Sequence, residues 1–248
     1  MSEHEENLWQ GIDRGARGSL NTRDYRAASF TQELSQRGLD GGELSAVDRS
    51  QPEIKDAWIP GVEIFARKVY PQRHRGLFSE LVRRDEGILA RIGFWPRQWS
   101  AARMFSGTSK GFHVHPPSIP ENSDPVDWLR RLYIDEPDNH SARSYDKEQW
   151  DVMFFIQGRV EIILYDIRAG LPRRAMRFFV DGDNHRSDNN VGVVIPPGVA
   201  HAIRVEGTED VIMIYGTSTV FRPEFEGRVA SDVETAALPE SWRKFLSL

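Results

Sequence analysis

The stretch Gly107-Thr-Ser-Lys-Gly-Phe-His113-Val-His115 decides the fold, together with Ile195-Pro-Pro-Gly-Val-Ala-His201 further along the chain. Both have the composition of strand edges, where side chains two residues apart point to the same side of a sheet. His113 and His115 are therefore expected to project together. The Pro-Pro-Gly turn can bring His201, on the strand that follows it, to the same place. Clustered imidazoles indicate either a metal site or proton-transfer chemistry.

Short strand signals recur on both sides of these segments. Apolar runs alternate with Gly and Pro turns roughly every ten residues. They lie at 62–70, 74–82, 88–94, 100–105, 152–166, 176–180, 191–195, 202–206 and 211–215. Gly158 divides the longest run and predicts a hairpin turn there. This spacing, without an alternating β–α pattern or a glycine-rich phosphate loop ahead of a helix, predicts an all-β sandwich or barrel.

The chain divides into three predicted parts. Residues 1–55 are polar and weakly periodic, and predict an irregular, partly ordered N-terminal extension interrupted by glycines at 38–42. Residues 56–235 contain the strand signals and a proline-rich polar loop at 116–148, whose length is typical of a functional or disordered segment. Residues 236–248 predict a short amphipathic C-terminal helix.

Composition limits the classes of function. With 37 acidic against 32 basic residues the net charge is −5, which argues against a dedicated nucleic-acid-binding protein. The chain has no cysteine, so any metal ligand must be His, Asp, Glu or water. No apolar run approaches the roughly 20 residues that span a bilayer, and the N-terminus has no secretory-signal pattern. We therefore expect a cytoplasmic protein that binds neither nucleic acid nor membrane.

The order of these motifs resembles a cupin, a jelly roll or double-stranded β-helix. Within the cupins it resembles the dTDP-4-dehydrorhamnose 3,5-epimerase family, from about Ile59 to Asp232. Four segments carry the resemblance: His74-Arg-Gly-Leu-Phe-Ser-Glu80 is similar to D-x-R-G-x-F-x-E, Ser109-Lys-Gly-Phe-His113 to R-G-L-H, Ile195-Pro-Pro-Gly-Val-Ala-His201 to I-P-x-G-F-A-H, and the stretch from Tyr215 through Pro223 to Asp232 to Y-x-x-T…Y-x-P-x-x-E…D.

The resemblance implies a homodimeric jelly roll that binds a nucleotide-linked 4-keto-6-deoxy sugar inside the barrel and needs no cofactor. It assigns nucleotide binding, partly across the dimer, to the segment with Arg75, Phe78 and Glu80. Lys110 stands at the position of a family arginine and, with Arg75, would hold the pyrophosphate. His113 would be the base that removes a proton beside the ketone, a task that suits the near-neutral pKa of imidazole.

Two departures bear on the implied reaction. Phe221 stands where the family has the tyrosine that delivers a proton to the opposite face, so Tyr215, Tyr133 or Tyr145 would have to serve as the acid. Asp151 falls near the place of the lysine that stabilises the enolate. The alternatives are a single epimerisation, a ketoisomerisation, a different reaction, or a protein that binds a sugar nucleotide without converting it.

A metal site is the competing prediction. The first segment fits the general cupin pattern G-x5-H-x-H, which makes His113 and His115 ligands, whereas the epimerase family usually has glutamine at the second position. Glu121, or secondarily Asp124, would add a carboxylate and His201 a third imidazole. Such a set suits a divalent transition metal in an oxygenase or isomerase of a small acid or ketone. In the epimerase interpretation, His201 is instead a polar wall or second proton carrier.

Overall fold

Strands make up nearly all of the regular structure. The computed structural model describes residues 25–27, 38–47, 58–115, 149–166, 168, 171, 174–185, 187, 189–221 and 227–228, with only the backbone for the first two ranges and the last. Its elements are β1 (Tyr25–Ala27), β2 (Gly38–Val47), β3 (Glu63–Ala66), β4 (Lys68–Pro71), η1 (Arg73–Arg75), β5 (Leu77–Glu80), α3 (Gly87–Ile92), β6 (Gln98–Met104), β7 (Ser109–Val114), β8 (Asp151–Gln157), β9 (Arg159–Asp166), β10 (Arg174–Asp181), η2 (Asp183–His185), β11 (Val191–Ile195), β12 (Val199–Glu206), β13 (Val211–Thr217) and β14 (Gly227–Arg228).

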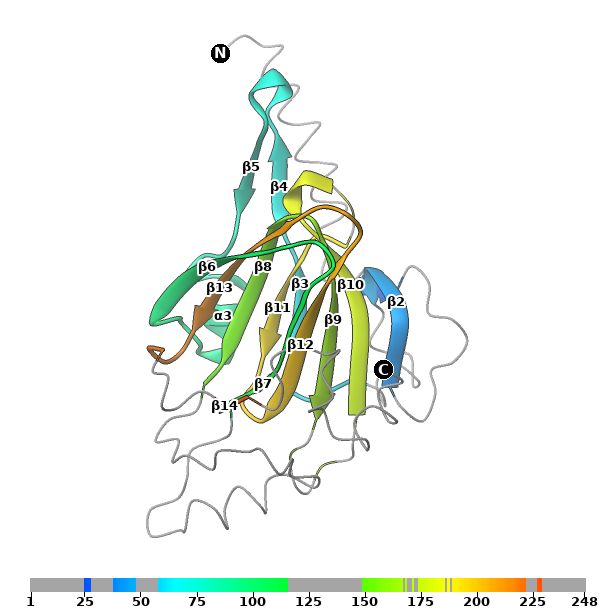
Figure 1. Cartoon of the computed structure of the whole chain (residues 1–248). Coiled ribbons are helices and arrows are strands. Elements are labelled where there is room, and N and C mark those ends of the chain that lie inside the picture. Colours follow the sequence, from blue (N-terminus) through cyan, green and yellow to red (C-terminus); the bar gives the residue numbers. More distant parts are fainter. Residues whose placement is uncertain are drawn as a thin grey trace.

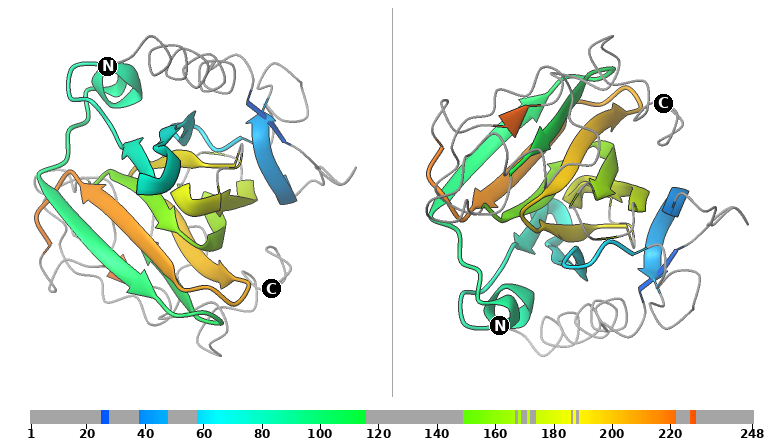
Figure 2. Two further views of the ribbon diagram at one scale, coloured as in Figure 1. Left: turned by 90° about the horizontal axis from the view of Figure 1, so that it is seen from above. Right: turned by 90° about the horizontal axis from the view of Figure 1, so that it is seen from below.

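Two sheets face one another and enclose the core (Figure 1; Figure 2 shows them from the two ends). One has the order β1-β2-β10-β9-β12-β7-β14 and the other β3-β11-β8-β13-β6. All pairings are antiparallel except that of β2 with β10. Most neighbours in these sheets are far apart in the sequence, as the crossovers of a jelly roll require. The predicted all-β jelly roll is confirmed.

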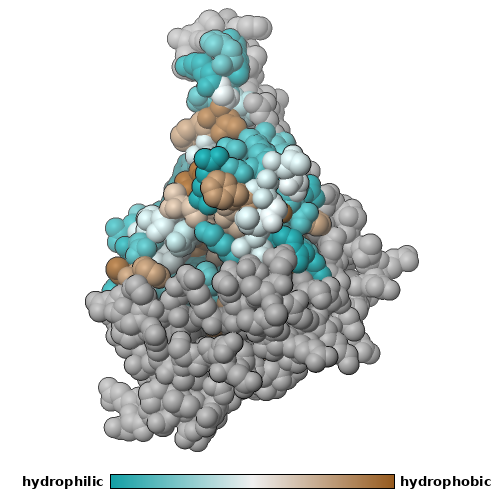
Figure 3. All heavy atoms as spheres, viewed as in Figure 1, coloured by the Kyte–Doolittle hydropathy of each residue, from teal (hydrophilic) through white to brown (hydrophobic). Residues whose placement is uncertain are grey.

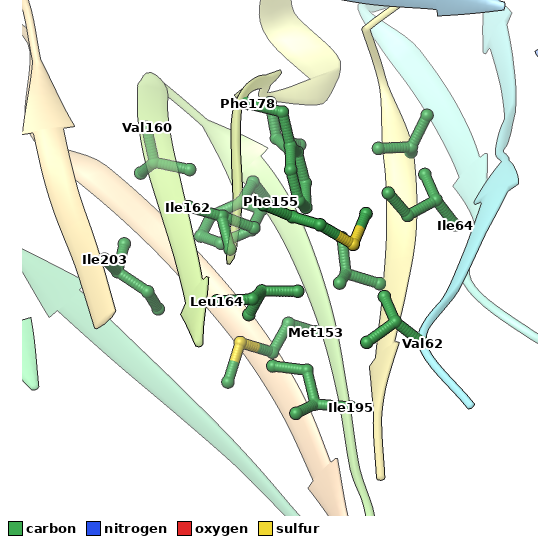
Figure 4. Packing of buried hydrophobic residues seen from close by; sticks show 14 of the residues in the cluster. Val62, Ile64, Met153, Phe155, Val160, Ile162, Leu164, Phe178, Ile195 and Ile203 are labelled. Carbon is green, nitrogen blue, oxygen red and sulfur yellow. The ribbon is translucent and has the colours of Figure 1, made fainter. Parts of the chain in front are cut away.

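The core lies between the sheets because every second residue of the central strands is apolar and points inward. Met153 and Phe155 of β8 pack in one buried cluster with Ile162 and Leu164 of β9, which belongs to the other sheet (Figure 4). The intervening residues of β9 are buried as well, so that β8 and β9 read in the sequence as continuous apolar runs. This explains why their positions could be predicted from the sequence.

Residues 87–92 form a helix, so the prediction of a strand at 88–94 is wrong. Helix α3 packs Ile88 and Leu89 with Phe154 in a second cluster, on the outer face of the five-stranded sheet. Gly93, in the left-handed conformation with φ 71°, ends the helix, and its N–H donates back to carbonyls of the last turn. Periodicity alone does not distinguish a short apolar run in a strand from one in a buried helical turn. Among the described residues, no helix is both long and apolar enough to cross a membrane.

Strand β2 occupies a segment that the sequence predicts as irregular. It pairs in parallel with β10 and antiparallel with β1. Backbone pairing with a formed sheet thus overrides the low strand propensity of its glycines. The loop predicted at 116–148 and the helix predicted at 236–248 lie outside the described residues, and the domain boundaries stay predictions.

Strands β4 and β5 form a separate two-stranded hairpin that projects from one end of the barrel (Figure 1). Phe78 is 51% exposed and stacks on Tyr70 across the pair, with 6.1 Å between ring centroids. The turn at Arg73–Arg75 is exposed and basic. Figure 3 shows hydrophilic residues at this tip and hydrophobic residues below it, along the hairpin. The hairpin therefore presents both charge and an aromatic surface away from the barrel.

Candidate functional site

The structure brings three histidines together at one end of the barrel interior. His113 lies on β7, directly opposite His201 on β12. His115 follows the end of β7, and its carbonyl accepts a hydrogen bond from the N–H of Gly198 at 2.6 Å. The ring centroid of His201 lies 5.9 Å from that of His113 and 5.6 Å from that of His115. The Pro-Pro-Gly turn is thus fastened to the end of β7, which holds the imidazoles in one cluster.

A β-bulge in β7 places Lys110 on the same side of the sheet as His113. His201 pairs with His113, but Ile203 pairs with Lys110, so β7 contains one residue more than β12 at this point. Since His201 and Ile203 share the inner face of β12, the backbone register puts their partners on that side too, although Lys110 itself is exposed. Gly111 lies inside the bulge with φ 105°, and a Cβ there would lie 2.6 Å from the carbonyl oxygen of His201. Only glycine fits this close approach.

Asp151, the first residue of β8, meets the histidines from the facing sheet. Its Oδ2 lies 3.4 Å from Nε2 of His115 and 3.6 Å from Nε2 of His201. Its Oδ1 accepts a hydrogen bond from Nε2 of Gln149 at 2.9 Å, and the Gln149 carbonyl accepts one from the Thr219 hydroxyl. The sequence marks Asp151 only as a departure from the family lysine. The presence of an aspartate near the place of the family lysine was therefore the sequence signal for the contact between Asp151 and the histidines.

Burial sets the charge of this cluster. Loss of hydration raises the pKa of the Asp151 carboxyl, against the opposing effects of His201 and Gln149. Burial also lowers the pKa of His201 to about 4, although the nearby Asp151 opposes the shift. His201 is therefore a neutral imidazole near neutral pH. Because a carbonyl can only accept, Nδ1 of His201 carries the proton and donates to the carbonyl of Val199 at 3.2 Å, which leaves Nε2 bare and facing Asp151.

Tyr215, a candidate proton donor, and Phe221, at the position of the family tyrosine, lie in different surroundings. Tyr215 is partly buried on β13 and packs against the core cluster. It shares the inner face with Thr217, two residues on, which pairs with Asp151. Phe221 is 53% exposed, and its backbone N–H donates to Oε1 of Gln98 at 2.8 Å. Tyr215 therefore faces the interior that contains the cluster, whereas the ring of Phe221 faces solvent.

The residues predicted to bind the nucleotide lie away from the histidines. Arg75 and Phe78 are exposed on the β4–β5 hairpin, and Glu80 accepts hydrogen bonds from Arg83 at 2.7 and 3.1 Å. The hairpin extends from the end of the barrel where β8 ends, while the cluster lies where β8 begins (Figure 1). Within one chain, the two sets are therefore at opposite ends. The remaining predicted site residues, Glu121, Asp124, Tyr133 and Tyr145, lie outside the described residues.

A two-sheet jelly roll with a polar cluster at one end of its interior defines a cupin-type protein. The solved structures that share this fold include two sugar-nucleotide enzymes. The chain is 18% identical to dTDP-6-deoxy-D-glucose-3,5-epimerase RmlC from Legionella pneumophila Philadelphia 1, with a TM-score of 0.50 and coverage of 77% of this chain and 78% of that one. It is 15% identical to a dTDP sugar isomerase from Desulfovibrio desulfuricans G20, with a TM-score of 0.51 and coverage of 77% and 97%.

The predicted resemblance to the dTDP-4-dehydrorhamnose 3,5-epimerases is thereby confirmed as a resemblance in fold at low sequence identity. Among curated proteins, the chain is 29% identical over 163 residues to the spore coat polysaccharide biosynthesis protein SpsL of Bacillus subtilis (strain 168), which covers 65% of this chain and 83% of that protein. A comparison with protein-family models finds no match. At these identities the solved structures establish the fold, and the activity has to be argued from the site.

Proposed function

We propose that the protein is an epimerase or isomerase that acts on a nucleotide-linked 4-keto-6-deoxy sugar. The observation that carries the proposal is the position of His113 on the inner face of β7, opposite His201, with the exposed Lys110 three residues earlier on the same strand. An imidazole base in the interior and an exposed cation farther along the same strand suit an anionic sugar nucleotide with an acidic C–H bond. The fold shared with enzymes named for dTDP sugars, and the similarity to a polysaccharide biosynthesis protein, support the same substrate class.

The proposed reaction starts with proton transfer to His113. The imidazole takes the proton from the carbon next to the ketone, and the electrons of that C–H bond form a C=C bond. The carbonyl π electrons move to oxygen and give an enolate. Return of a proton to carbon, from the same or the opposite face, restores the ketone with retained or inverted configuration. No oxidant or reductant is needed, and a base with a near-neutral pKa serves in both directions.

Tyr215 is the acid that we propose for the opposite face. Phe221 has no hydroxyl group and its ring is exposed. Tyr215 lies on the inner face of the sheet that faces His113, so the two side chains come from opposite walls of the barrel. An acid and a base on opposite walls are the arrangement that inversion at carbon requires.

The nucleotide is proposed to lie partly against a second copy of the chain. Arg75 and Phe78 have the chemistry for it, a guanidinium for phosphate and an aromatic ring for a base. They lie on the hairpin of β4 and β5, which extends from the end of the barrel opposite the cluster of their own chain (Figure 1). A homodimer in which each hairpin reaches the partner's barrel would complete the site, in line with the resemblance.

Hydrogen–deuterium exchange tests this function directly. The full chain is incubated in D₂O with dTDP-4-keto-6-deoxyglucose, and deuterium at the carbons next to the ketone is followed by NMR. We expect exchange by the wild type and at least a 100-fold slower exchange in His113→Gln, in the range for loss of a general base. The matched control is His185→Gln, because His185 is exposed and paired with Glu209, far from the site in sequence and structure.

Absence of exchange by the wild type would contradict the proposal. The exposed Phe221, which lacks the hydroxyl of the family tyrosine, favours one second candidate, a protein that binds the sugar nucleotide without converting it. In that case dTDP sugars would raise the Tm of the wild type while no deuterium enters the sugar.

A further inference from the structure

We propose that His115, Asp151 and His201 form a binding site for a divalent transition metal ion, with His113 beside it and outside the ligand set. The three residues each offer one ligand atom, and these atoms all lie within 4.8 Å of one another. Two imidazoles and one carboxylate are a common protein ligand set for such ions. The carboxylate differs from the one expected from the sequence, which was Glu121.

The spacing of the atoms fits a single ion. Bonds of about 2.1 Å in tetrahedral geometry place neighbouring ligand atoms about 3.4 Å apart. Asp151 Oδ2 lies 3.4 Å from Nε2 of His115 and 3.6 Å from Nε2 of His201. Because the three ligand atoms all lie within 4.8 Å of one another, an ion needs only small side-chain shifts to contact all of them.

Two of the three ligands, His201 and Asp151, are held by a second side-chain contact, and His115 is held through its backbone. Nδ1 of His201 donates to the carbonyl of Val199, and Oδ1 of Asp151 accepts from Gln149. The backbone of His115 is tied to Gly198. These contacts leave Nε2 of His201 and Oδ2 of Asp151 pointing at one another. Such outer contacts orient ligands in metal sites and fix the histidine tautomer.

Charge is the strongest argument. The described part of the chain buries four other carboxylates, and each has an arginine within ion-pair distance: Asp183 with Arg67, Asp166 with Arg168, Glu161 with Arg177 and Arg204, and Asp181 with Arg159. Among the same residues, Asp151 pairs with no lysine or arginine and faces imidazoles instead. A buried carboxylate without a cation is costly. A bound divalent ion supplies that cation.

The role of the site in catalysis rests on the proposed function, whereas ion binding itself does not. A bound ion would polarise the ketone oxygen and stabilise the enolate, the task that the resemblance gives to a lysine near the position of Asp151. His113 stays available as the base, with its ring centroid 5.9 Å from that of His201. Asp151 stands near the place of the family lysine and His115 at the place of the family glutamine. Both departures would then supply ligands to an ion that takes over the task of the lysine.

Metal titration of the chelator-treated full chain tests the site. Co²⁺ binding is followed by visible absorption and Zn²⁺ binding by calorimetry, with metal content checked by elemental analysis. We expect one ion per chain, and affinities at least 10-fold weaker in His115→Gln and in Asp151→Asn. His185→Gln and Glu121→Gln are expected to bind as tightly as the wild type. Failure of the wild type to bind a stoichiometric ion would overturn the site, as would loss of binding in Glu121→Gln with Asp151→Asn unaffected.

Two further measurements keep the result interpretable. If Asp151→Asn does not fold, as judged by circular dichroism, a rise in wild-type Tm with added Zn²⁺ still reports binding, and His115→Gln, at a partly exposed position, should reduce that rise. A bound ion in a wild type that shows no deuterium exchange would sustain the site and contradict the proposed function. Full exchange by metal-free wild type would sustain the function and overturn the catalytic role of the ion.

Discussion

The Oδ2 atom of Asp151 lies 3.4 Å from Nε2 of His115, although the two residues come from opposite sheets. Asp151 begins β8 of the five-stranded sheet, and His115 follows β7 of the seven-stranded one. The candidate site therefore exists only where the two sheets are packed at the correct register. Substitutions that displace one sheet relative to the other should disturb the site as well as the fold.

Gly111→Ala should destabilise the protein strongly, because a Cβ would lie 2.6 Å from the carbonyl oxygen of His201 and 2.8 Å from Cα of Ala202. Gly107→Ala is the matched control, since Gly107 also has positive φ (72°) but no atom within 4 Å of the added Cβ. Both changes carry about 1–2 kcal/mol of backbone strain, and Gly111→Ala should cost about 1–3 kcal/mol more through the steric clash. Urea denaturation measures the difference, and equal losses would contradict the assigned close approach.

The contributions of Arg67 and Asp183 to the free energy of unfolding should be strongly coupled. They form a bidentate ion pair at 2.6 and 3.0 Å, with both side chains fully buried. Replacing either partner alone, by Arg67→Met or Asp183→Asn, should lower the free energy of unfolding by about 3–5 kcal/mol, because a charge is left buried and unpaired. The double variant should lose clearly less than the sum of the two. Additive losses in chemical denaturation would show that the pair is not coupled.

Lys110→Ala should weaken substrate binding more than turnover, if the proposed function is correct. Lys110 is exposed on the strand that contains His113, and its ammonium would contact the diphosphate as a charge-assisted donor. We expect KM to rise about 10- to 100-fold with kcat little changed, the pattern for a uniform binding contact. Lys110→Arg keeps the charge and should retain most of the affinity. A fall in kcat at unchanged KM would contradict a role in binding.

A mixture of two impaired variants should regain activity. If the hairpin of one chain completes the site of its partner, Arg75→Ala and His113→Gln damage different sites in a mixed dimer, and one intact site forms. Random exchange of subunits should restore about a quarter of the wild-type rate. The measurement is deuterium exchange before and after joint refolding, with each variant refolded alone as the control. No recovery, with dimers formed, would place Arg75 in the site of its own chain or outside the site.

Asp210 should make a pH-dependent contribution to stability. The backbone N–H of Ser106 and the guanidinium of Arg103 hold the pKa of Asp210 below its ordinary value. A lowered folded-state pKa stabilises the fold above the unfolded-state pKa, and the contribution is lost as the pH falls through the folded-state value. Asp210→Asn should therefore lower Tm slightly at neutral pH, and the two proteins should converge as the pH falls below the folded-state pKa of Asp210. A Tm difference that is constant with pH would contradict the linkage.

The sequence by itself determined the strands, the jelly roll and the grouping of three histidines. These follow from local rules: apolar runs of strand length, Gly and Pro at the turns, and a two-residue repeat that puts His113 and His115 on one side. The order of short motifs added the resemblance to the epimerases. The same rules could not separate strand from helix at α3, or show that the glycine-rich β2 finds a partner in β10.

Only the tertiary structure decided what surrounds the histidines. The bulge at Gly111 shifts the register so that the exposed Lys110 pairs with Ile203, and the packing of the two sheets brings Asp151 against His115 and His201. Both depend on which residues of distant strands pair and how the two sheets are registered. No local pattern encodes that register, because it is set by the fit of the whole core.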